Sequence, residues 1–307
     1  MLGAKSIILI LTKSALNIKY LAMSLITEFD PWKNELCTCP AKFSLSPYTG
    51  CSHGCLYCYA WSYIRDFSNP RPKKDFTKKL ERQIKKIPAG SIIPIANSSD
   101  PYLHLEKKLK LTRKMLEILK NYDLILNLVT KSDLILRDLD LLKQFKKIIV
   151  SISVTTLDEK LAKKLEPQAP SPSQRLNAAS KLAKHMPVII RLDPLIYPLT
   201  TEKLEDTIKA IKQTSAIQVI TSTYKARGDN LKRMTGVFKE NELFWKKLYL
   251  ERGEKKSGYW YLPKVLRKEL IANVSEITLR ENLKFSSCRE GFDNLNTAAC
   301  DGTDLFK

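Results

Sequence analysis

The sequence predicts an α/β protein, a partial (β/α)6 barrel of the TIM type followed by a C-terminal extension. Short apolar runs and amphipathic helical segments alternate about six times between residues 42 and 223. Most of these runs are apolar throughout, which is typical of parallel strands that are buried on both faces. The alternation ends near Lys225. These observations favour one parallel sheet covered by helices.

The elements follow in order along the chain. The predicted strands are residues 42–45, 91–96, 124–130, 147–154, 187–192 and 217–223. In the segments between them, apolar residues recur every three or four positions, as on one face of a helix. The predicted helices are residues 75–87, 112–121, 137–147, 157–165, 173–185 and 201–213, with Thr200 or Thr201 as the cap of the last. Six units are fewer than the eight of a closed barrel, so we expect an open barrel with right-handed crossovers.

We expect three parts: an N-terminal segment (1–34), the barrel (35–227) and a helical, cysteine-containing extension (228–307). In the extension, residues 240–250 and 264–271 are predicted helices and residues 253–258 a loop.

The N-terminal segment begins with an apolar run at residues 7–11. This run is far shorter than the ~20 residues of a membrane-spanning helix, and no small-residue cleavage site follows it. We therefore expect residues 1–22 to lie outside the fold, with Met23 as a candidate start. The expected location is cytoplasmic, without membrane attachment.

The composition, with 44% hydrophobic and 27% charged residues, excludes a disordered tail, a collagen-like fibre and a polytopic membrane protein. The chain has 52 Lys+Arg against 32 Asp+Glu, a formal net charge of +20. A field of this sign favours polyanionic partners, either nucleic acid or an anionic lipid surface. The alternative is a Lys-rich composition of the thermophilic kind, in which the charge is spread over solvated helix faces.

Five of the seven cysteines lie within residues 37–58. Such clustering indicates metal or redox ligands rather than a disulfide scaffold. In one glycine-containing loop, three thiols are separated by three and then two residues: Cys51, Cys55 and Cys58. Three thiolates can hold a four-iron cluster and leave one iron open to another ligand. The alternative is a structural zinc with His53 as the fourth ligand.

This C-x3-C-x2-C loop, with an aromatic residue before its last cysteine, resembles the radical S-adenosylmethionine (SAM) superfamily. The wider string at residues 46–60 resembles its spore photoproduct lyase-like (DNA-repair photolyase-like) branch. Further segments resemble that branch in the same order: residues 97–102, 130–132, 151–156, 191–194 and 288–291. The resemblance, which covers about residues 35–305, implies a [4Fe-4S] cluster, S-adenosylmethionine and a 5'-deoxyadenosyl radical. It also implies an electron donor such as ferredoxin or flavodoxin.

Polar residues at or after the strand ends are the candidates for binding S-adenosylmethionine: Ser98, Ser99, Asp100, Lys131, Ser153, Thr155 and Arg191. The carboxyl ends of parallel strands meet at one rim, where cofactors bind in such folds. The resemblance implies that the first three lie near the methionine amine. Lys131 and Arg191 are then candidates for the carboxylate, and the two hydroxyl residues for the ribose. Alternatively, each of these side chains caps the next helix or meets solvent.

The remaining cysteines form two distant pairs: Cys37, Cys39, Cys288 and Cys300. Together they could supply four ligands to an auxiliary iron-sulfur cluster or a zinc ion, which would tie the two ends of the chain together. The alternative is four unconnected buried thiols.

The predicted function is radical SAM chemistry on a nucleic acid, in repair or modification. Residues 224–227 and 259–264 mix aromatic and basic side chains, a pattern that suits exposed bases. Spore photoproduct lyases use a cysteine inside the barrel as a hydrogen donor, but this sequence has none between residues 59 and 287. Candidate donors are therefore Cys288, Cys300 and Tyr224, or the reaction differs. The alternatives are a radical enzyme acting on a protein or small molecule, and a non-catalytic metal-containing nucleic-acid binder.

Overall fold

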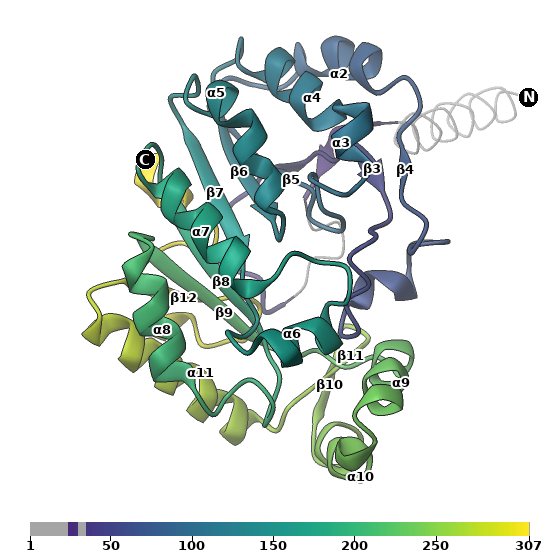
Figure 1. Cartoon of the computed structure of the whole chain (residues 1–307), viewed down its shortest axis with the longest axis vertical. Helices are drawn as coiled ribbons and strands as arrows, with labels where there is room; N and C mark the ends of the chain where they lie inside the picture. The colour runs from purple at the N-terminus through teal and green to yellow at the C-terminus, as the bar shows by residue number, and fades with distance from the viewer. Residues whose placement is uncertain (1–23, 30–34, 307) are drawn as a thin grey trace, which may run out of the picture.

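The computed structural model describes residues 24–29 and 35–306. The prediction for residues 1–22 and Met23 lies outside this part of the chain. The centre of the molecule is a six-stranded parallel sheet with the strand order β12-β9-β8-β7-β6-β5 (Figure 1). Its strands are β5 (Ser91–Ile95), β6 (Leu124–Thr130), β7 (Ile148–Ser153), β8 (Val188–Leu195), β9 (Gln218–Thr223) and β12 (Lys284–Ser287). The expected α/β fold class, a partial TIM-like barrel, is confirmed.

Helices connect the strands and pack against the outer face of the sheet (Figure 1). They are α2 (Phe76–Ile84), α3 (Glu106–Leu109), α4 (Leu111–Leu119), α5 (Leu139–Leu142), α6 (Glu159–Leu165), α7 (Pro172–Ala183), α8 (Leu204–Gln213) and α11 (Lys264–Arg280). Side-chain caps explain where two of them begin. Asp158 accepts hydrogen bonds from Lys160 N and Leu161 N, both at 2.9 Å, and Ser171 forms a capping box with Gln174.

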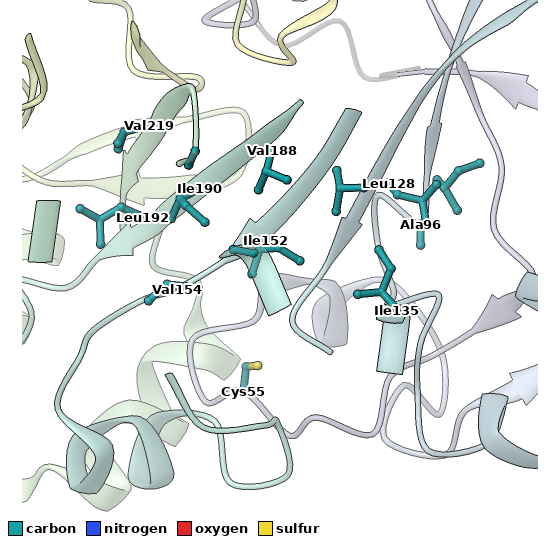
Figure 2. Packing of buried hydrophobic residues seen from close by; sticks show 14 of the residues in the cluster. Cys55, Ala96, Leu128, Ile135, Ile152, Val154, Val188, Ile190, Leu192 and Val219 are labelled. Atoms are coloured by element: carbon teal, nitrogen blue, oxygen red, sulfur yellow. The ribbon is translucent and has the colours of Figure 1, made fainter. Parts of the chain in front are cut away.

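Apolar side chains of neighbouring strands form the core between the sheet and these helices. Figure 2 shows Leu128, Ile152, Val188, Ile190 and Val219 side by side along the sheet, and all five are fully buried. Their burial is the main favourable contribution to folding. Successive side chains of a strand point to opposite faces of the sheet. The residues that alternate with these five therefore point to the inner face of the barrel.

That inner face is covered by residues 299–306, which we call the C-terminal plug. Ile149, Ile189 and Ile220 pack against it near the amino ends of their strands. Asn127 Nδ2 donates to Asp301 O at 2.9 Å, and Gln218 Nε2 donates to Ala299 O at 2.9 Å. The plug therefore fills the barrel from the amino ends of the strands and leaves the carboxyl ends free for a site.

The strand predicted at residues 42–45 forms differently from the expectation. β2 (Phe43–Ser44) pairs antiparallel with β1 (Thr27–Glu28), and only Leu45 bridges to Ile95 in the parallel sense. The sixth strand of the sheet is instead β12, which was not predicted. The sequence of β12 is KFSS, with a single large apolar residue, so it carries no strand-like periodicity. The expected extension thus contributes one strand to the barrel.

Several helix predictions also need correction. Only residues 139–142 of the helix predicted at 137–147 form an α-helix, α5, and a 3-10 turn at residues 133–138 precedes it. Asp138, where the turn ends, pairs with Arg113 and Arg137. Lys203, rather than Thr200 or Thr201, is the N-cap of α8. The Thr200 hydroxyl instead accepts a hydrogen bond from Ile196 N at 2.8 Å.

Beyond the barrel, α9 (Gly228–Val237) was not predicted. The helix expected at 240–250 is α10 (Glu242–Trp245) continued by a π-helical turn, and the helix expected at 264–271 extends as α11 to Arg280. The expected loop at 253–258 lies largely in a hairpin of β10 (Glu254–Lys256) and β11 (Tyr259–Tyr261). In the described ranges, no helix has both the length and the apolarity to cross a bilayer.

Candidate active site

One cavity of about 230 Å³ lies at the carboxyl ends of the strands. Most of the residues predicted for the site line it: Cys51, Cys55, Cys58, Ser98, Ser99, Asp100, Lys131, Ser153, Arg191, Tyr224 and Cys288. Figure 2 places Cys55 beyond Ile152 and Val154, near the end of β7. Four predicted residues do not line this cavity: Thr155, Cys37, Cys39 and Cys300.

Backbone contacts hold the loop that carries the first three cysteines. Gly50 has a φ of 84°, and a Cβ there would lie 2.6 Å from Phe67 O, so the turn requires glycine. Cys51 N donates to the same Phe67 oxygen at 2.8 Å. On the other side, Arg233 Nη2 donates to Cys58 O at 2.6 Å. Both ends of the loop are thus fixed to the fold.

Burial raises the pKa of all three loop thiols, that of Cys55 to about 12. The repulsion that the three would exert on one another as thiolates adds to this effect. A metal centre that binds thiolates would displace these protons and offset the repulsion. Three soft thiol donors on one wall of a cavity therefore fit an iron-sulfur cluster with an open position. In the described residues, no three or more His, Cys, Asp or Glu side chains are arranged as a formed metal site.

Asp100 links the end of β5 to the end of β6. Its Oδ1 accepts from Thr130 Oγ1 at 2.7 Å and its Oδ2 from Lys131 N at 2.8 Å. His53 Nε2 lies 3.0 Å from Asp100 Oδ2, so His53 faces this carboxylate. Burial alone would raise the pKa of Asp100, but His53 and these hydrogen bonds hold it below its usual value. Asp100 thus ties the cysteine loop to two strand ends.

The two serines before Asp100 also contact the cysteine-loop region. Ser99 Oγ donates to Gly50 O at 2.8 Å, and Ser98 Oγ accepts from the Tyr63 hydroxyl at 3.1 Å. The hydroxyls therefore position the loop as well as lining the cavity.

Lys131 lies beside a buried carboxylate, Glu166, that the sequence did not reveal. Its Nζ is 3.8 Å from Glu166 Oε1, and Arg175 Nη1 is 2.5 Å from the other oxygen. Thr155 Oγ1 donates to Glu166 Oε1 at 2.7 Å, so Thr155 supports Glu166 instead of facing the cavity. The Tyr57 hydroxyl also donates to Glu166. Burial alone would lower the pKa of Lys131, but Glu166 and Cys55 raise it, so the ammonium group stays charged.

Arg191 is paired inside the barrel. Its Nη2 lies 2.7 Å from Asp193 Oδ2, and it also hydrogen-bonds Cys288. Asp193 lines the cavity and accepts from Ser222 Oγ at 2.5 Å. Asp193 belongs to the 191–194 string, but its pairing with Arg191 was not predicted.

The two distant cysteine pairs come together. Cys39 Sγ and Cys300 Sγ are 3.0 Å apart. Cys37 hydrogen-bonds to Cys39, and Cys288 to Cys300. Hydrogen bonds among these thiols lower the pKa of Cys39 and Cys288 and raise that of the other two. Of the four, only Cys288 lines the cavity.

Tyr224, the third candidate hydrogen donor, has its hydroxyl bound to Asn230 Oδ1 at 2.7 Å. Burial raises its pKa well above the usual value, so the phenol stays protonated.

Aromatic rings and cations gather beside the cavity. The Tyr59 and Tyr259 rings meet edge to face with centroids 5.4 Å apart. The guanidinium groups of Arg227 and Arg289 lie 5.0 and 5.3 Å from the centroid of Tyr259. Tyr59 and Arg289 also line the cavity. The sequence indicated Tyr259 and Arg227 by composition, but Arg289 has no periodic signal and depends on β12 for its position.

Two relatives align with part of the chain. An uncharacterized protein of Methanocaldococcus jannaschii is 36% identical over 146 residues, 46% of this chain and 55% of that protein. The chain thus aligns with about half the length of this relative. An uncharacterized protein of Acidianus two-tailed virus is 27% identical over 227 residues, 66% of this chain and 72% of the viral protein.

Solved structures share the fold. A spore photoproduct lyase mutant with bound AdoMet and dinucleoside spore photoproduct has a TM-score of 0.61 and 18% identity, over 82% of this chain and 76% of that one. Streptococcus suis SuiB bound to its precursor peptide SuiA has a TM-score of 0.53 and 18% identity, over 80% of this chain and 48% of SuiB.

The model of the Radical SAM superfamily matches residues 45–225, more than half of the chain. This range begins at the strand residue before the cysteine loop and ends at Lys225, which lines the cavity. It therefore contains the three loop thiols and the ends of β5 to β9. The chain belongs to the radical SAM superfamily.

Proposed function

We propose that this protein is a radical SAM enzyme that acts on a nucleic acid, in repair or modification. The superfamily implies a [4Fe-4S] cluster and S-adenosylmethionine in general. When bound, these cofactors supply a 5'-deoxyadenosyl radical, which removes a hydrogen atom from the substrate. The observation that carries the proposal is that one cavity is lined both by the loop thiols and by the polar strand ends.

Cys51, Cys55 and Cys58 would hold the cluster. They are the only cysteines of the described chain that line the cavity from one short loop. The fixed backbone of that loop keeps the thiols on one wall, and thiolate coordination has no neutral substitute of similar strength. A reductant such as ferredoxin or flavodoxin would deliver the electron.

Lys131 is the best placed cation for the carboxylate of S-adenosylmethionine. It lines the same cavity as the loop thiols and remains charged beside Glu166. Arg191 is a weaker candidate, because Asp193 already neutralises it. Ser98, Ser99 and Ser153 present hydroxyl groups to the cavity for the amine and the ribose.

A nucleic-acid substrate is supported by charge and by the aromatic residues beside the cavity. The chain carries a formal net charge of +20, which attracts polyanions. Tyr59 and Arg289 line the cavity, and the buried Tyr259 packs against both of them. An aromatic ring and a cation at the cavity suit an unstacked base. A solved relative of the same fold, spore photoproduct lyase, binds a dinucleoside photoproduct. Cys288 and Tyr224 are the candidate hydrogen donors that line the cavity.

The enzymatic part of the proposal is tested by anaerobic reconstitution with iron and sulfide, reduction, and assay for 5'-deoxyadenosine. We expect the full chain to form it and Cys55→Ala to lose both the iron and the product. Ser52→Ala, a matched change in the same loop that removes no thiol, should behave as the parent. Formation of 5'-deoxyadenosine by Cys55→Ala at the parental rate would overturn the cluster assignment.

The substrate is tested by adding defined probes to the same assay. Irradiated DNA, unirradiated DNA, transfer RNA and a peptide mixture are compared for stimulation of 5'-deoxyadenosine formation. We expect a nucleic acid to stimulate it, and less so when Tyr259 is changed to alanine. Stimulation by peptides alone would assign the enzyme to protein modification. Binding alone is not a sufficient readout, since any strongly basic protein binds nucleic acid in low salt.

A further inference from the structure

We propose that four cysteines outside the loop form a second metal site, which takes one tetrahedrally bound divalent ion of the zinc class: Cys37, Cys39, Cys288 and Cys300. The site is separate from the proposed cluster and does not depend on the proposed function.

The four cysteines converge from distant parts of the chain. The contact between Cys39 and Cys300 joins residues 261 positions apart, with 3.0 Å between the two sulfurs. Each of these two cysteines has a further thiol as a hydrogen-bond partner, Cys37 on one side and Cys288 on the other. Three separate segments thus bring four thiols into one continuous group: residues 37–39, the residue after β12, and the start of the C-terminal plug. Unconnected buried thiols would not be expected to meet in this way.

Two buried cations face this group of thiols. Lys42 is 8% exposed, hydrogen-bonds Cys39 and pairs with Asp301 at 2.8 Å. On the other side, Arg191 hydrogen-bonds Cys288 while it pairs with Asp193. Four thiolates around a divalent ion retain negative charge, and buried charge requires partners of opposite sign. These two cations lie where such charge would form.

The size of the site distinguishes a zinc ion from an iron-sulfur cluster, the two metal classes that the sequence left open. On a tetrahedral zinc with bonds of about 2.3 Å, two thiolate sulfurs lie about 3.8 Å apart. The sulfurs of Cys39 and Cys300 need to separate by less than 1 Å from their 3.0 Å contact to reach this geometry. A four-iron cluster places irons and sulfides between its thiolates and requires much more room. A contact between Cys39 and Cys300 as short as 3.0 Å is therefore better suited to one ion than to a cluster.

A metal ion here would give the C-terminal plug a defined role. The ion would link the plug, through Cys300, to the segment before β2, through Cys37 and Cys39. Cys288 would link the end of β12 to both. Since Cys288 lines the cavity and precedes Arg289, the ion would also fix one wall of the candidate active site. As metal ligands, Cys288 and Cys300 would not serve as hydrogen donors, which leaves Tyr224.

The test is metal analysis of the full chain, purified without chelators and then loaded with iron under anaerobic conditions. We expect about one zinc per chain beside the iron of the loop cluster. Cys300→Ala and Cys37→Ala should lose the zinc, whereas Cys37→His, which keeps a zinc-binding atom, should retain most of it. Thr38→Ala is the matched control and should keep the parental zinc content. Cobalt substitution provides a second measurement on the unmutated chain, through the absorption of a tetrahedral thiolate site.

Three outcomes would overturn the proposal. One is zinc-free protein in which the four thiols are alkylated in the folded state. Another is about eight iron per chain, falling to about four in Cys300→Ala, which would show a second cluster instead. The third is a disulfide between Cys39 and Cys300 in protein kept under reducing conditions. None of these results depends on 5'-deoxyadenosine formation, so failure of this proposal is distinguishable from failure of the enzymatic one.

Discussion

Replacement of Glu166 by glutamine should destabilise the protein by several kcal/mol at neutral pH. The carboxylate is fully buried and interacts with Arg175 at 2.5 Å and Lys131 at 3.8 Å. Burial alone would raise the pKa of Glu166, but these two cations and two hydroxyl donors lower it from 4.5 to about 2. At 1.36 kcal/mol per pH unit, this difference corresponds to about 3 kcal/mol of stability. The loss of one partner from a buried ion pair has a cost of the same order, about 3–5 kcal/mol.

The pH dependence provides a second check with a defined sign. Because the pKa of Glu166 is lower in the folded protein, its contribution to stability is complete above pH 4.5 and is lost as the pH falls toward 2. Urea unfolding of the parent and Glu166→Gln at pH 7, 5 and 3 measures this contribution. The difference between the two proteins should be largest at pH 7 and shrink by pH 3. Glu205→Gln, which removes an exposed partner of Lys209, should have no measurable effect.

The reasoning is refuted by a difference under about 1 kcal/mol at pH 7, well below the cost of breaking a buried ion pair. It is also refuted by a difference that stays constant between pH 7 and pH 3.

Two further variants test the plug and the cofactor pocket. Gly302→Ala should be less stable than Gly258→Ala in urea unfolding. Both glycines have a positive φ, but a Cβ at Gly302 would lie 2.3 Å from Ile189 Cδ1, whereas a Cβ at Gly258 would meet no atom within 4 Å. Overpacking at Gly302 should lower the free energy of unfolding by about 1–3 kcal/mol more than the change at Gly258 does. Equal losses of stability in the two variants would contradict the close approach of the plug to the sheet. Lys131→Met should weaken binding of S-adenosylmethionine to cluster-loaded protein by at least about tenfold in calorimetric titration, since it removes a buried cation from the pocket. Exposed Lys160→Met is the control, and unchanged binding by Lys131→Met would exclude Lys131 from the carboxylate site.

The strands of the barrel were predictable where their own residues carry a strong strand-like pattern. β6 and β7 are largely apolar runs and β9 is rich in β-branched residues, so composition and length suffice to predict them. β12 was missed, because its four residues form a strand only through contacts with β9. The 3-10 turn at residues 133–138 was also missed; its last residue, Asp138, pairs with Arg113 on another helix, a contact that no local pattern shows.

In the candidate site, too, residues marked by local spacing were predictable, and residues brought together only by the fold were not. The loop thiols were recognisable, since their spacing lies within eight residues of chain. The meeting of Cys39 with Cys300 could be only a hypothesis before the fold was known. Glu166 gave no signal at all, because a buried carboxylate is recognised by the cations around it, and Asp193 was marked only as part of the string at residues 191–194. The cations around Glu166 come from another helix and another strand end, whereas Arg191, the partner of Asp193, lies two residues away on the same strand.

The C-terminal plug has a consequence for how the chain folds. Residues 299–306 and β12 complete a barrel whose other strands lie up to two hundred positions earlier, so the last contacts to form are among the most distant along the chain. Such non-local closure carries a large entropic penalty before any contact compensates it, and folding rates fall as sequence separation grows. A partly folded barrel with β9 as an unpaired edge and an open apolar interior is therefore an expected intermediate. That species would expose strand edges prone to aggregation, so conditions that speed the arrival of the plug should improve the yield of refolded protein.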